Sequence, residues 1–215
     1  MYDPLLSMVI KNKLHKGDVF IDIGANSGFL SLLASTVVGR SGRVYSFEPT
    51  KRIFGKLVKN IKLNGFDNII PYNLALGNEN KTSVFYDMGK YDGSNSFVRY
   101  DNGSPEITII RKLDDVLPNG ITPNFVKIDV EGFEKEVLLG AKRTILENDR
   151  VILVYEYNRS ILRKKREKYN EVIDLLHEYG FKLRAMNDKL MDIESREVKS
   201  YHDLNPWGCN VYAFK

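Results

Sequence analysis

The sequence predicts a single α/β domain built on a parallel, doubly wound sheet, and three observations support that prediction. Short apolar runs alternate along the chain with segments of helical periodicity, a pattern typical of βαβ units. One of these runs, residues 19–23, passes through a glycine-containing turn directly into a helical pattern. The 215 residues suffice for one full α/β domain and are too few for two ordinary ones.

Each element is assigned from its period and from the residues that end it. A leading helix is expected within residues 1–16, over 4–14, and the turn 15–17 ends it. Gly65 stands where a helix C-terminal glycine belongs. The expected strands cover 18–23, 43–47, 68–76, 124–129, 151–157, 181–186 and 209–214. The expected connecting helices cover 29–38, 51–64, 133–146 and a long helix whose end is 169–179.

An insertion over residues 78–122 interrupts this alternation. Residues 82–86 and 106–110 have extended character, and residues 88–105 between them are rich in Gly, Ser, Asn and Asp. We expect the two extended segments to pair as a hairpin around this loop. A loop of that length inside a compact domain is usually functional or disordered.

The turn after the first strand indicates a ligand site of a particular kind. Its spacing, Asp22-x-Gly24-x-x-x-Gly28, places glycine where the backbone turns sharply and where the next helix packs. A dinucleotide fingerprint would place its second and third glycines where Asn26 and Phe29 stand. The turn is therefore not built for a pyrophosphate, which argues against a nicotinamide-dependent dehydrogenase.

Glu48 directly follows the second expected strand, and Pro49 stiffens the loop after it. In a doubly wound sheet, a carboxylate at this point accepts two hydrogen bonds from a ribose diol. Its distance along the chain from the glycine turn is about that of a nucleoside site. Together, the turn and Glu48 predict a ligand that contains a nucleoside but no pyrophosphate.

Composition narrows the class of protein further. The net charge of +4 is mild for a nucleic-acid binder, and the densest basic run, 163–168, fits a solvated helix face. No apolar run reaches the ~20 residues that span a bilayer, and the N-terminus lacks the apolar core of a signal peptide. The single cysteine, Cys209, cannot form an internal disulfide, which fits the reducing cytoplasm.

These motifs together resemble a known family. Residues 21–28, Ile-Asp-Ile-Gly-Ala-Asn-Ser-Gly, followed by Phe-Glu-Pro at 47–49, look like a class I S-adenosylmethionine-dependent methyltransferase. The block Val-Lys-Ile-Asp-Val-Glu-Gly-Phe-Glu at 126–134 is similar to the FkbM family, as are residues 73–77, 113–116 and 137–141. Members of that family are mostly O-methyltransferases that act on hydroxyls of sugars and secondary metabolites.

The resemblance implies a fold, a cofactor and its binding residues. The fold would be one domain over 1–215, with a seven-stranded, mostly parallel sheet, helices on both faces and an antiparallel last strand. The cofactor would be S-adenosyl-L-methionine, with S-adenosyl-L-homocysteine as its product. The residues implied for it are Asp22, Ile23, Gly24, Ala25, Asn26, Ser27, Gly28, Glu48, Pro49, Asn73, Leu74, Ala75 and Asp129, with Glu48 on the ribose and 73–76 beside the adenine.

A hydroxyl acceptor also needs a general base, because its proton must leave as its oxygen attacks. The candidates are the carboxylates that follow the fourth and fifth strands, Asp129, Glu131 and Glu156. Lys127 shares a strand face with Asp129, and its ammonium would make Asp129 a weak base. His202 is an alternative, since imidazole titrates near neutral pH. It belongs to residues 187–208, which we expect on the substrate side.

The same three carboxylates could instead hold Mg²⁺, which prefers hard oxygen ligands, although we do not expect a metal. The three histidines and one cysteine lack the spacing of a zinc site. For the acceptor, the amides and hydroxyls of Ser94, Asn95 and Ser96 suit a polyhydroxylated molecule, and the glycine beside them would allow the loop to close.

The sequence therefore predicts an O-methyltransferase that acts on a sugar, a glycoside or another small hydroxylated metabolite. An RNA methyltransferase is the second hypothesis, favoured by the basic run at 163–168. The absence of an Asn-Pro-Pro-Tyr-type motif argues against it, so nucleic acid is the less expected partner. A third hypothesis is a module of the same fold that binds the cofactor without turnover.

Overall fold

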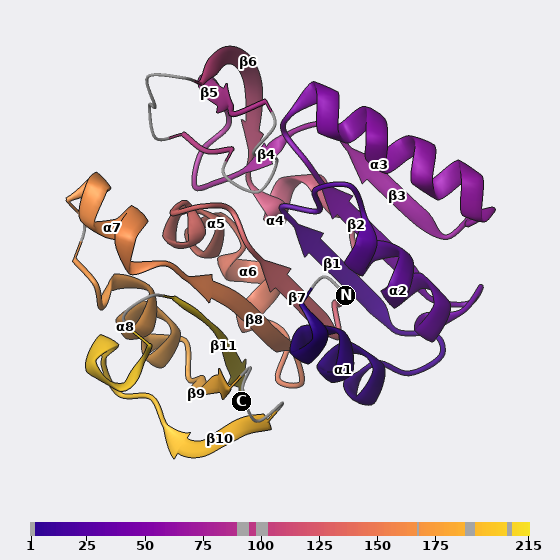
Figure 1. Cartoon of the computed structure of the whole chain (residues 1–215). Coiled ribbons are helices and arrows are strands. Elements are labelled where there is room, and N and C mark those ends of the chain that lie inside the picture. The colour runs from indigo at the N-terminus through magenta and orange to yellow at the C-terminus, as the bar shows by residue number, and fades with distance from the viewer. Residues whose placement is uncertain (1–2, 90–94, 98–102, 167, 188–191, 206–207) are drawn as a thin grey trace.

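The computed structural model describes residues 3–89, 95–97, 103–166, 168–187, 192–205 and 208–215. Its centre is one eight-stranded sheet in the order β10-β9-β11-β8-β7-β1-β2-β3 (Figure 1). These strands are β1 (Val19–Ile23), β2 (Arg43–Phe47), β3 (Ile69–Tyr72), β7 (Phe125–Ile128), β8 (Ile152–Tyr157), β9 (Lys182–Asn187), β10 (Asp192–Glu197) and β11 (Cys209–Phe214).

The strand directions confirm the doubly wound sheet with an antiparallel last strand. Neighbouring strands from β3 through β2, β1 and β7 to β8 are parallel, whereas β11 is antiparallel to both β8 and β9. The additional strand is β10, which pairs antiparallel with β9 at the edge of the sheet. β10 was not predicted because residues 192–197, Asp-Ile-Glu-Ser-Arg-Glu, contain a single apolar residue.

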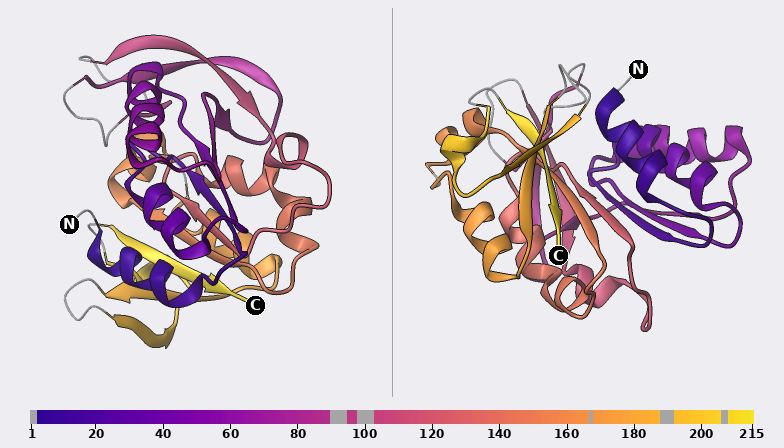
Figure 2. Two further views of the ribbon diagram at one scale, coloured as in Figure 1. Left: turned by 90° about the vertical axis from the view of Figure 1, so that its right-hand side faces the viewer. Right: turned by 90° about the horizontal axis from the view of Figure 1, so that it is seen from below.

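Helices cover both faces of the sheet, and each face has its own apolar core (Figure 2). One face carries α1 (Pro4–Lys13), α2 (Phe29–Val38) and α3 (Lys51–Asn64). The other carries α4 (Leu113–Val116), α5 (Glu134–Gly140), α6 (Lys142–Leu146), α7 (Arg159–Lys165) and α8 (Glu171–Glu178). A 3₁₀ turn, η2 (Tyr201–Asp203), follows β10. No helix among the described residues is long and apolar enough to cross a bilayer.

Three predicted elements are divided in the structure, each at a residue with a local cause. The helix over 133–146 is interrupted at Ala141, directly after Gly140, on which a Cβ would lie 1.8 Å from the carbonyl oxygen of Gly77. The long helix before 179 is two helices, because Arg166 ends α7 in the left-handed conformation at φ 57°. The strand over 68–76 ends at Tyr72, and the next residue, Asn73, donates to the carbonyl oxygens of Glu48 and Pro49.

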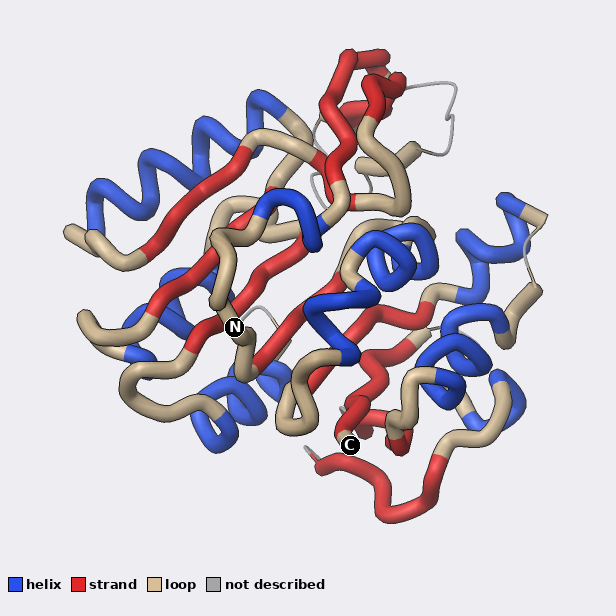
Figure 3. The backbone as a smooth tube through the Cα atoms, turned by 180° about the vertical axis from the view of Figure 1, so that it is seen from behind, coloured by secondary structure: helices blue, strands red, loops and turns tan. Residues whose placement is uncertain are grey.

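The predicted hairpin is present as part of a second, three-stranded sheet (Figure 3). Its strands are β4 (Ala75–Leu76), β5 (Lys81–Asp87) and β6 (Ser104–Arg111), in the order β4-β6-β5, and β5 and β6 are antiparallel. A bidentate ion pair fastens the hairpin to α3: Arg52 donates to both carboxylate oxygens of Asp87, at 2.9 and 2.7 Å. The same guanidinium also donates to the carbonyl oxygen of Gly89.

The register of the parallel strands brings their carboxyl ends to one edge. Ile23 pairs with Phe47 on one side and with Ile128 on the other. From β1 the chain continues outward to β2 and β3, and later returns to the opposite side as β7 and β8. The winding therefore reverses between β1 and β7, which is where open α/β sheets bind ligands.

Candidate functional site

A crevice of about 790 Å³ lies at this reversal point, between the strand ends and the hairpin. Aromatic side chains of the hairpin and of the segment after β7 close one side, with Phe97 4.9 Å from Phe85 and 4.4 Å from Phe133 between ring centroids. The residues that line it are Ile23, Gly24, Asn26, Phe47, Glu48, Pro49, Leu74, Ala75, Leu76, Phe85, Asn95, Phe97, Asp129, Val130, Glu131, Phe133 and Glu156.

The glycine turn after β1 is shaped by close contacts within the protein. At Gly24, φ is +77°, and a Cβ would lie 1.8 Å from the carbonyl oxygen of Asp129. At Gly28, φ is +93°, and a Cβ would lie 2.5 Å from a methyl carbon of Leu57 on α3. We expected Gly28 to let the helix pack on the strand, whereas its missing side chain in fact makes room for α3.

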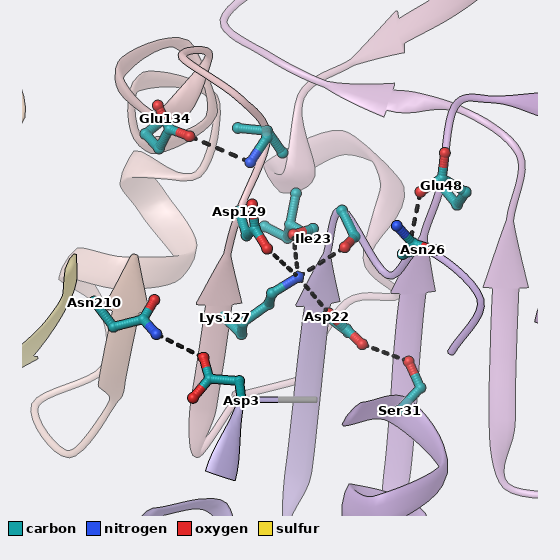
Figure 4. A network of polar contacts seen from close by, with 12 residues as sticks. Asp3, Asp22, Ile23, Asn26, Ser31, Glu48, Lys127, Asp129, Glu134 and Asn210 are labelled. Atoms are coloured by element: carbon teal, nitrogen blue, oxygen red, sulfur yellow. Dashed lines mark hydrogen bonds and ion pairs between the residues drawn. The ribbon is translucent and has the colours of Figure 1, made fainter. Parts of the chain in front are cut away.

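Lys127 lies beneath this turn with its ammonium among oxygen atoms of two strands (Figure 4). Its Nζ is 2.7 Å from the carbonyl oxygen of Gly24 and 3.2 Å from Oδ1 of Asp22, and it is 3.6 Å from Oδ2 of Asp129. Asp22 is fully buried, and its other oxygen accepts a hydrogen bond from Ser31 at 2.6 Å. Through these contacts, the ammonium of Lys127 links the end of β1 to the end of β7.

Glu48 is 5% exposed, and its carboxylate already accepts two hydrogen bonds from the backbone. Oε2 accepts from the amide of Asn26 at 3.0 Å (Figure 4). Oε1 accepts from the amide of Thr50 at 2.9 Å. Burial raises the pKa of Glu48, and the hydrogen bonds from Thr50 and Asn26 oppose that rise. The side-chain hydroxyl of Thr50 donates a third hydrogen bond to this carboxylate. Of the about four lone-pair sites of a carboxylate, one therefore remains for a hydroxyl group of a ligand.

Three carboxyl groups gather at the opposite end of the crevice. Asp129, Glu131 and Glu156 each offer an oxygen atom within 4.8 Å of the others. Burial, followed by the charges of Asp129 and Glu134, raises the pKa of Glu131 to about 8. Burial and the same neighbouring carboxylates raise the pKa of Glu156 to about 9. Near neutral pH, these two side chains are therefore mostly protonated and close to the pH at which each ionises.

Glu134 builds the turn that presents Glu131. Its Oε1 accepts hydrogen bonds from the amides of Val130 and Gly132, both at 3.2 Å. Glu131 lies between them with φ of +53°, a left-handed conformation that non-glycine residues rarely adopt. Burial raises the pKa of Glu134 to about 7. Glu134 belongs to the motif at 126–134, but the sequence alone did not predict a role for it.

Several of the residues expected to bind the cofactor support the crevice without lining it. Asp22 is buried under the turn, and Asn73 holds the loop after Glu48. Ala25 and Ser27 line a neighbouring cavity together with Phe29 and Lys127, and Gly28 lies against α3. The remaining predicted cofactor residues, namely Ile23, Gly24, Asn26, Glu48, Pro49, Leu74, Ala75 and Asp129, all line the crevice.

The residues expected at the acceptor have different outcomes. Asn95 lines the crevice, and its amide holds the hairpin together by accepting from the amide of Met88 and donating to Thr50. Ser96 is fully buried, and its carbonyl oxygen accepts from the amide of Tyr86; Ser94 lies outside the described residues. His202 is exposed on η2 with its ring 4.0 Å from that of Tyr201, and it is not among the residues that line the crevice.

Two features of the site were not predicted from the sequence: the aromatic side of the crevice, and the position of Lys127 among the oxygen atoms. Phe85, Phe97 and Phe133 are scattered over the hairpin and the segment after β7, so no local pattern linked them. The charge of Lys127 was recognised only in relation to Asp129. Lys127 lies two residues after Phe125, on the same face of β7. This spacing was the signal that could have placed Lys127 beside Asp22.

The order of the strands and the crevice at their carboxyl ends define a class I methyltransferase fold. A family model described as the methyltransferase FkbM domain matches residues 22–183. The chain therefore belongs to the FkbM family of methyltransferase domains, as its motifs predicted.

Comparison with individual proteins gives more distant similarity. A hexuronic acid methyltransferase, AglP of Haloferax volcanii, is 26% identical over 147 residues, which cover 67% of this chain and 59% of that protein. The methyltransferase FkbM of Methylobacillus flagellatus KT superposes with a TM-score of 0.60 at 17% identity, covering 94% of this chain and 44% of that one. Aeropyrum pernix fibrillarin, whose structure contains S-adenosyl-L-methionine, superposes with a TM-score of 0.57 at 16% identity, covering 97% and 73%. The chain thus spans little more than half the length of AglP.

Proposed function

We propose that this protein is an S-adenosylmethionine-dependent O-methyltransferase whose acceptor is a hydroxyl of a sugar, a glycoside or another small hydroxylated metabolite. The observation that carries the proposal is the crevice itself, with a carboxylate suited to a ribose at one end and ionisable carboxyl groups at the other. The family membership supports methyl transfer, and the similarity to a hexuronic acid methyltransferase supports a sugar acceptor.

The residues at the first end fit the proposed cofactor. Glu48 has a lone pair left for a ribose hydroxyl, and the backbone around Gly24 gives the methionine moiety a surface without side chains. When bound, S-adenosyl-L-methionine supplies a methyl group already activated by its sulfonium. Leu74 and Ala75 then flank the adenine, and Asp129 faces the methionine end of the crevice.

At the second end, the protein must orient a hydroxyl and accept its proton. In this proposal, the ionised carboxylate of Glu131 or Glu156 takes the proton from the acceptor hydroxyl as the oxygen attacks the methyl carbon. A carboxylate with a pKa of about 8 or 9 is a far stronger base than an ordinary glutamate, and a positioned base contributes about 10²–10⁴-fold to such a step. Alignment of the acceptor oxygen supplies the rest.

Binding of the cofactor is tested by calorimetric titration with S-adenosyl-L-homocysteine, for which we expect micromolar affinity. A screen with tritiated methyl donor over neutral glycosides, uronic acids, small hydroxylated metabolites and bulk RNA then identifies the acceptor class, with and without EDTA. Failure to bind at millimolar ligand would contradict the proposal. Methyl transfer to RNA alone, with a steep dependence on salt, would favour the RNA methyltransferase. Binding without transfer to any acceptor would favour a non-catalytic module.

A further inference from the structure

The ammonium of Lys127 lies between the end of β1 and the end of β7, with oxygen atoms of both segments around it. Its side chain is 4% exposed, and it lies between the carbonyl oxygen of Gly24 at 2.7 Å and that of Ile23 at 3.4 Å. It also lies between two carboxylates, Asp22 at 3.2 Å and Asp129 at 3.6 Å. Figure 4 shows these oxygen atoms converging on Nζ from both strands.

We propose that Lys127 is a positioning residue of the active site, which fixes the carbonyl oxygen of Gly24 and the carboxylate of Asp129 where the methionine end of the cofactor meets them. The inference rests on the proposed function, because it assigns that end of the crevice to the cofactor. Lys127 acts through these two groups and does not itself line the main crevice.

Energetics favour positioning over stability as the main contribution of Lys127. A buried ion pair adds little net stability, since the cost of removing both charges from water offsets their attraction. Its removal is different, because two carboxylates would remain near each other without their cation. Oδ1 of the fully buried Asp22 accepts no hydrogen bond within the described part of the chain, so Lys127 is its charged neighbour. Without Lys127, the two carboxylates repel each other and the turn is released.

Lys127 also sets the electrostatic potential of the crevice. The carboxyl groups on which its charge acts are Asp22 on β1, Glu48 after β2, and Asp129 and Glu131 after β7. Glu134 on α5 and Glu156 on β8 interact in turn with the carboxylate of Asp129. The charge of Lys127 lowers the pKa of both Glu48 and Glu131 against the effect of burial. Removal of that charge should therefore raise the pH at which Glu131 ionises.

The test compares Lys127→Met with Lys215→Met, a matched control. The side chain of Lys215 is 15% exposed, and its ammonium likewise donates to backbone carbonyl oxygens, those of Ile145 and Asn148, both at 3.0 Å. Titration calorimetry measures affinity for S-adenosyl-L-homocysteine, thermal unfolding measures stability, and single-turnover transfer is followed from pH 6 to 10. Lys127→Gln is a second variant: its amide can still donate to Gly24 but carries no charge.

We expect Lys127→Met to weaken the binding of S-adenosyl-L-homocysteine at least tenfold and to shift the rise of activity to higher pH. Lys215→Met should change this affinity less than twofold, even if its melting temperature falls as much as that of Lys127→Met. Lys127→Gln should keep more of the affinity but show the same shift of the pH profile, and it decides the matter if Lys127→Met does not fold. Wild-type affinity and an unchanged pH profile in both Lys127 variants would leave Lys127 a purely structural residue and overturn the proposal. Failure of the wild-type protein itself to bind would overturn the proposed function and this inference with it.

Discussion

Gly24 and Asp129 approach each other so closely that no side chain fits between them. A Cβ on Gly24 would lie 1.8 Å from the carbonyl oxygen of Asp129, and φ of Gly24 is +77°. The turn after β1 and the end of β7 are therefore a single unit, in which a displacement of either segment moves the other. This unit forms the floor of the crevice.

The first prediction concerns Gly24→Ala, which we expect to abolish binding of S-adenosyl-L-homocysteine and to lower the free energy of unfolding by more than about 2 kcal/mol. The left-handed backbone alone costs about 1–2 kcal/mol, and the added methyl group must in addition displace the segment after β7. Gly65→Ala is the matched control, since φ there is +67° and no atom lies within 4 Å of the new methyl group. Equal losses in the two variants, with binding retained in both, would disprove this account of the turn.

The second prediction concerns Glu48→Gln. This substitution should lower the affinity for S-adenosyl-L-homocysteine roughly ten- to hundredfold, as measured by calorimetry. Hydrogen bonds to a charged group contribute about 1.5–3 kcal/mol each, and glutamine replaces one of the two acceptor oxygens with a donor. That donor would face the amide of Asn26 or of Thr50.

Glu106→Gln serves as the control for this substitution. Glu106 likewise accepts from a backbone amide, that of Lys51 at 3.3 Å, but it does not line the crevice. Its variant should bind with wild-type affinity. If Glu48→Gln did so as well, Glu48 would not contact the ribose.

The third prediction follows from the raised pKa values of Glu131 and Glu156, about 8 and 9. An unfolded glutamate ionises near pH 4.5, so between that pH and the folded pKa the unfolded chain releases a proton that the folded protein keeps. The free energy of unfolding should therefore fall as pH rises from about 4.5 to 9. Glu156→Gln cannot ionise, and at pH 9 it should be more stable than the wild type by an amount on the order of 1–2 kcal/mol.

Urea denaturation between pH 5 and 9 measures this difference, and the exposed Glu147→Gln provides the control. The stability advantage of Glu156→Gln should be much smaller near pH 5, where the folded carboxyl group is protonated and the unfolded one is close to its own pKa. Methyl transfer distinguishes the two candidate bases: a slowing of at least tenfold at alkaline pH assigns the base to Glu156, and an unchanged rate assigns it to Glu131. A stability difference that does not depend on pH would mean that the carboxyl group ionises normally.

The main sheet and the crevice-lining residues at the ends of β1 and β2 could be predicted from the sequence because their signals are local. The run 19–23, the glycine turn and Glu48 each follow their strand directly, so the register of parallel strands was enough to bring them to one edge. The side of the crevice formed by the hairpin could not be predicted in the same way. Phe97 reaches Phe133 across more than thirty residues of sequence, and nothing near either residue indicates the other.

Elements were misjudged where tertiary contacts override local periodicity. The apolar pattern through 133–146 is continuous, yet the helix is interrupted at Ala141, next to Gly140, against which the backbone of Gly77 packs. Residues 69–76 are apolar except for Asn73, which bonds to the loop after Glu48 where the strand ends and the chain passes into the second sheet. Likewise, His202 was a candidate base by its intrinsic chemistry, and only the position of η2 separates it from the crevice.

The last prediction concerns the attachment of the hairpin to α3. Arg52 forms two parallel hydrogen bonds with Asp87, whose side chain is 9% exposed, and the same guanidinium donates to Gly89. A lysine keeps the charge but cannot form both bonds at once. The hairpin carries Phe85, Asn95 and Phe97 into the crevice, so Arg52→Lys should loosen the acceptor side while β1 and β2 keep the cofactor side intact.

We therefore expect Arg52→Lys to raise the KM for the acceptor roughly three- to tenfold, equivalent to about 1 kcal/mol, with affinity for S-adenosyl-L-homocysteine unchanged within twofold. Arg43→Lys is the control, because Arg43 donates only to nearby backbone carbonyl oxygens at the start of β2, the opposite end from the crevice. Steady-state kinetics with the acceptor found in the screen and calorimetry with S-adenosyl-L-homocysteine separate the two effects. A loss of cofactor affinity in Arg52→Lys, with the acceptor KM unchanged, would assign the hairpin to the cofactor and not to the acceptor.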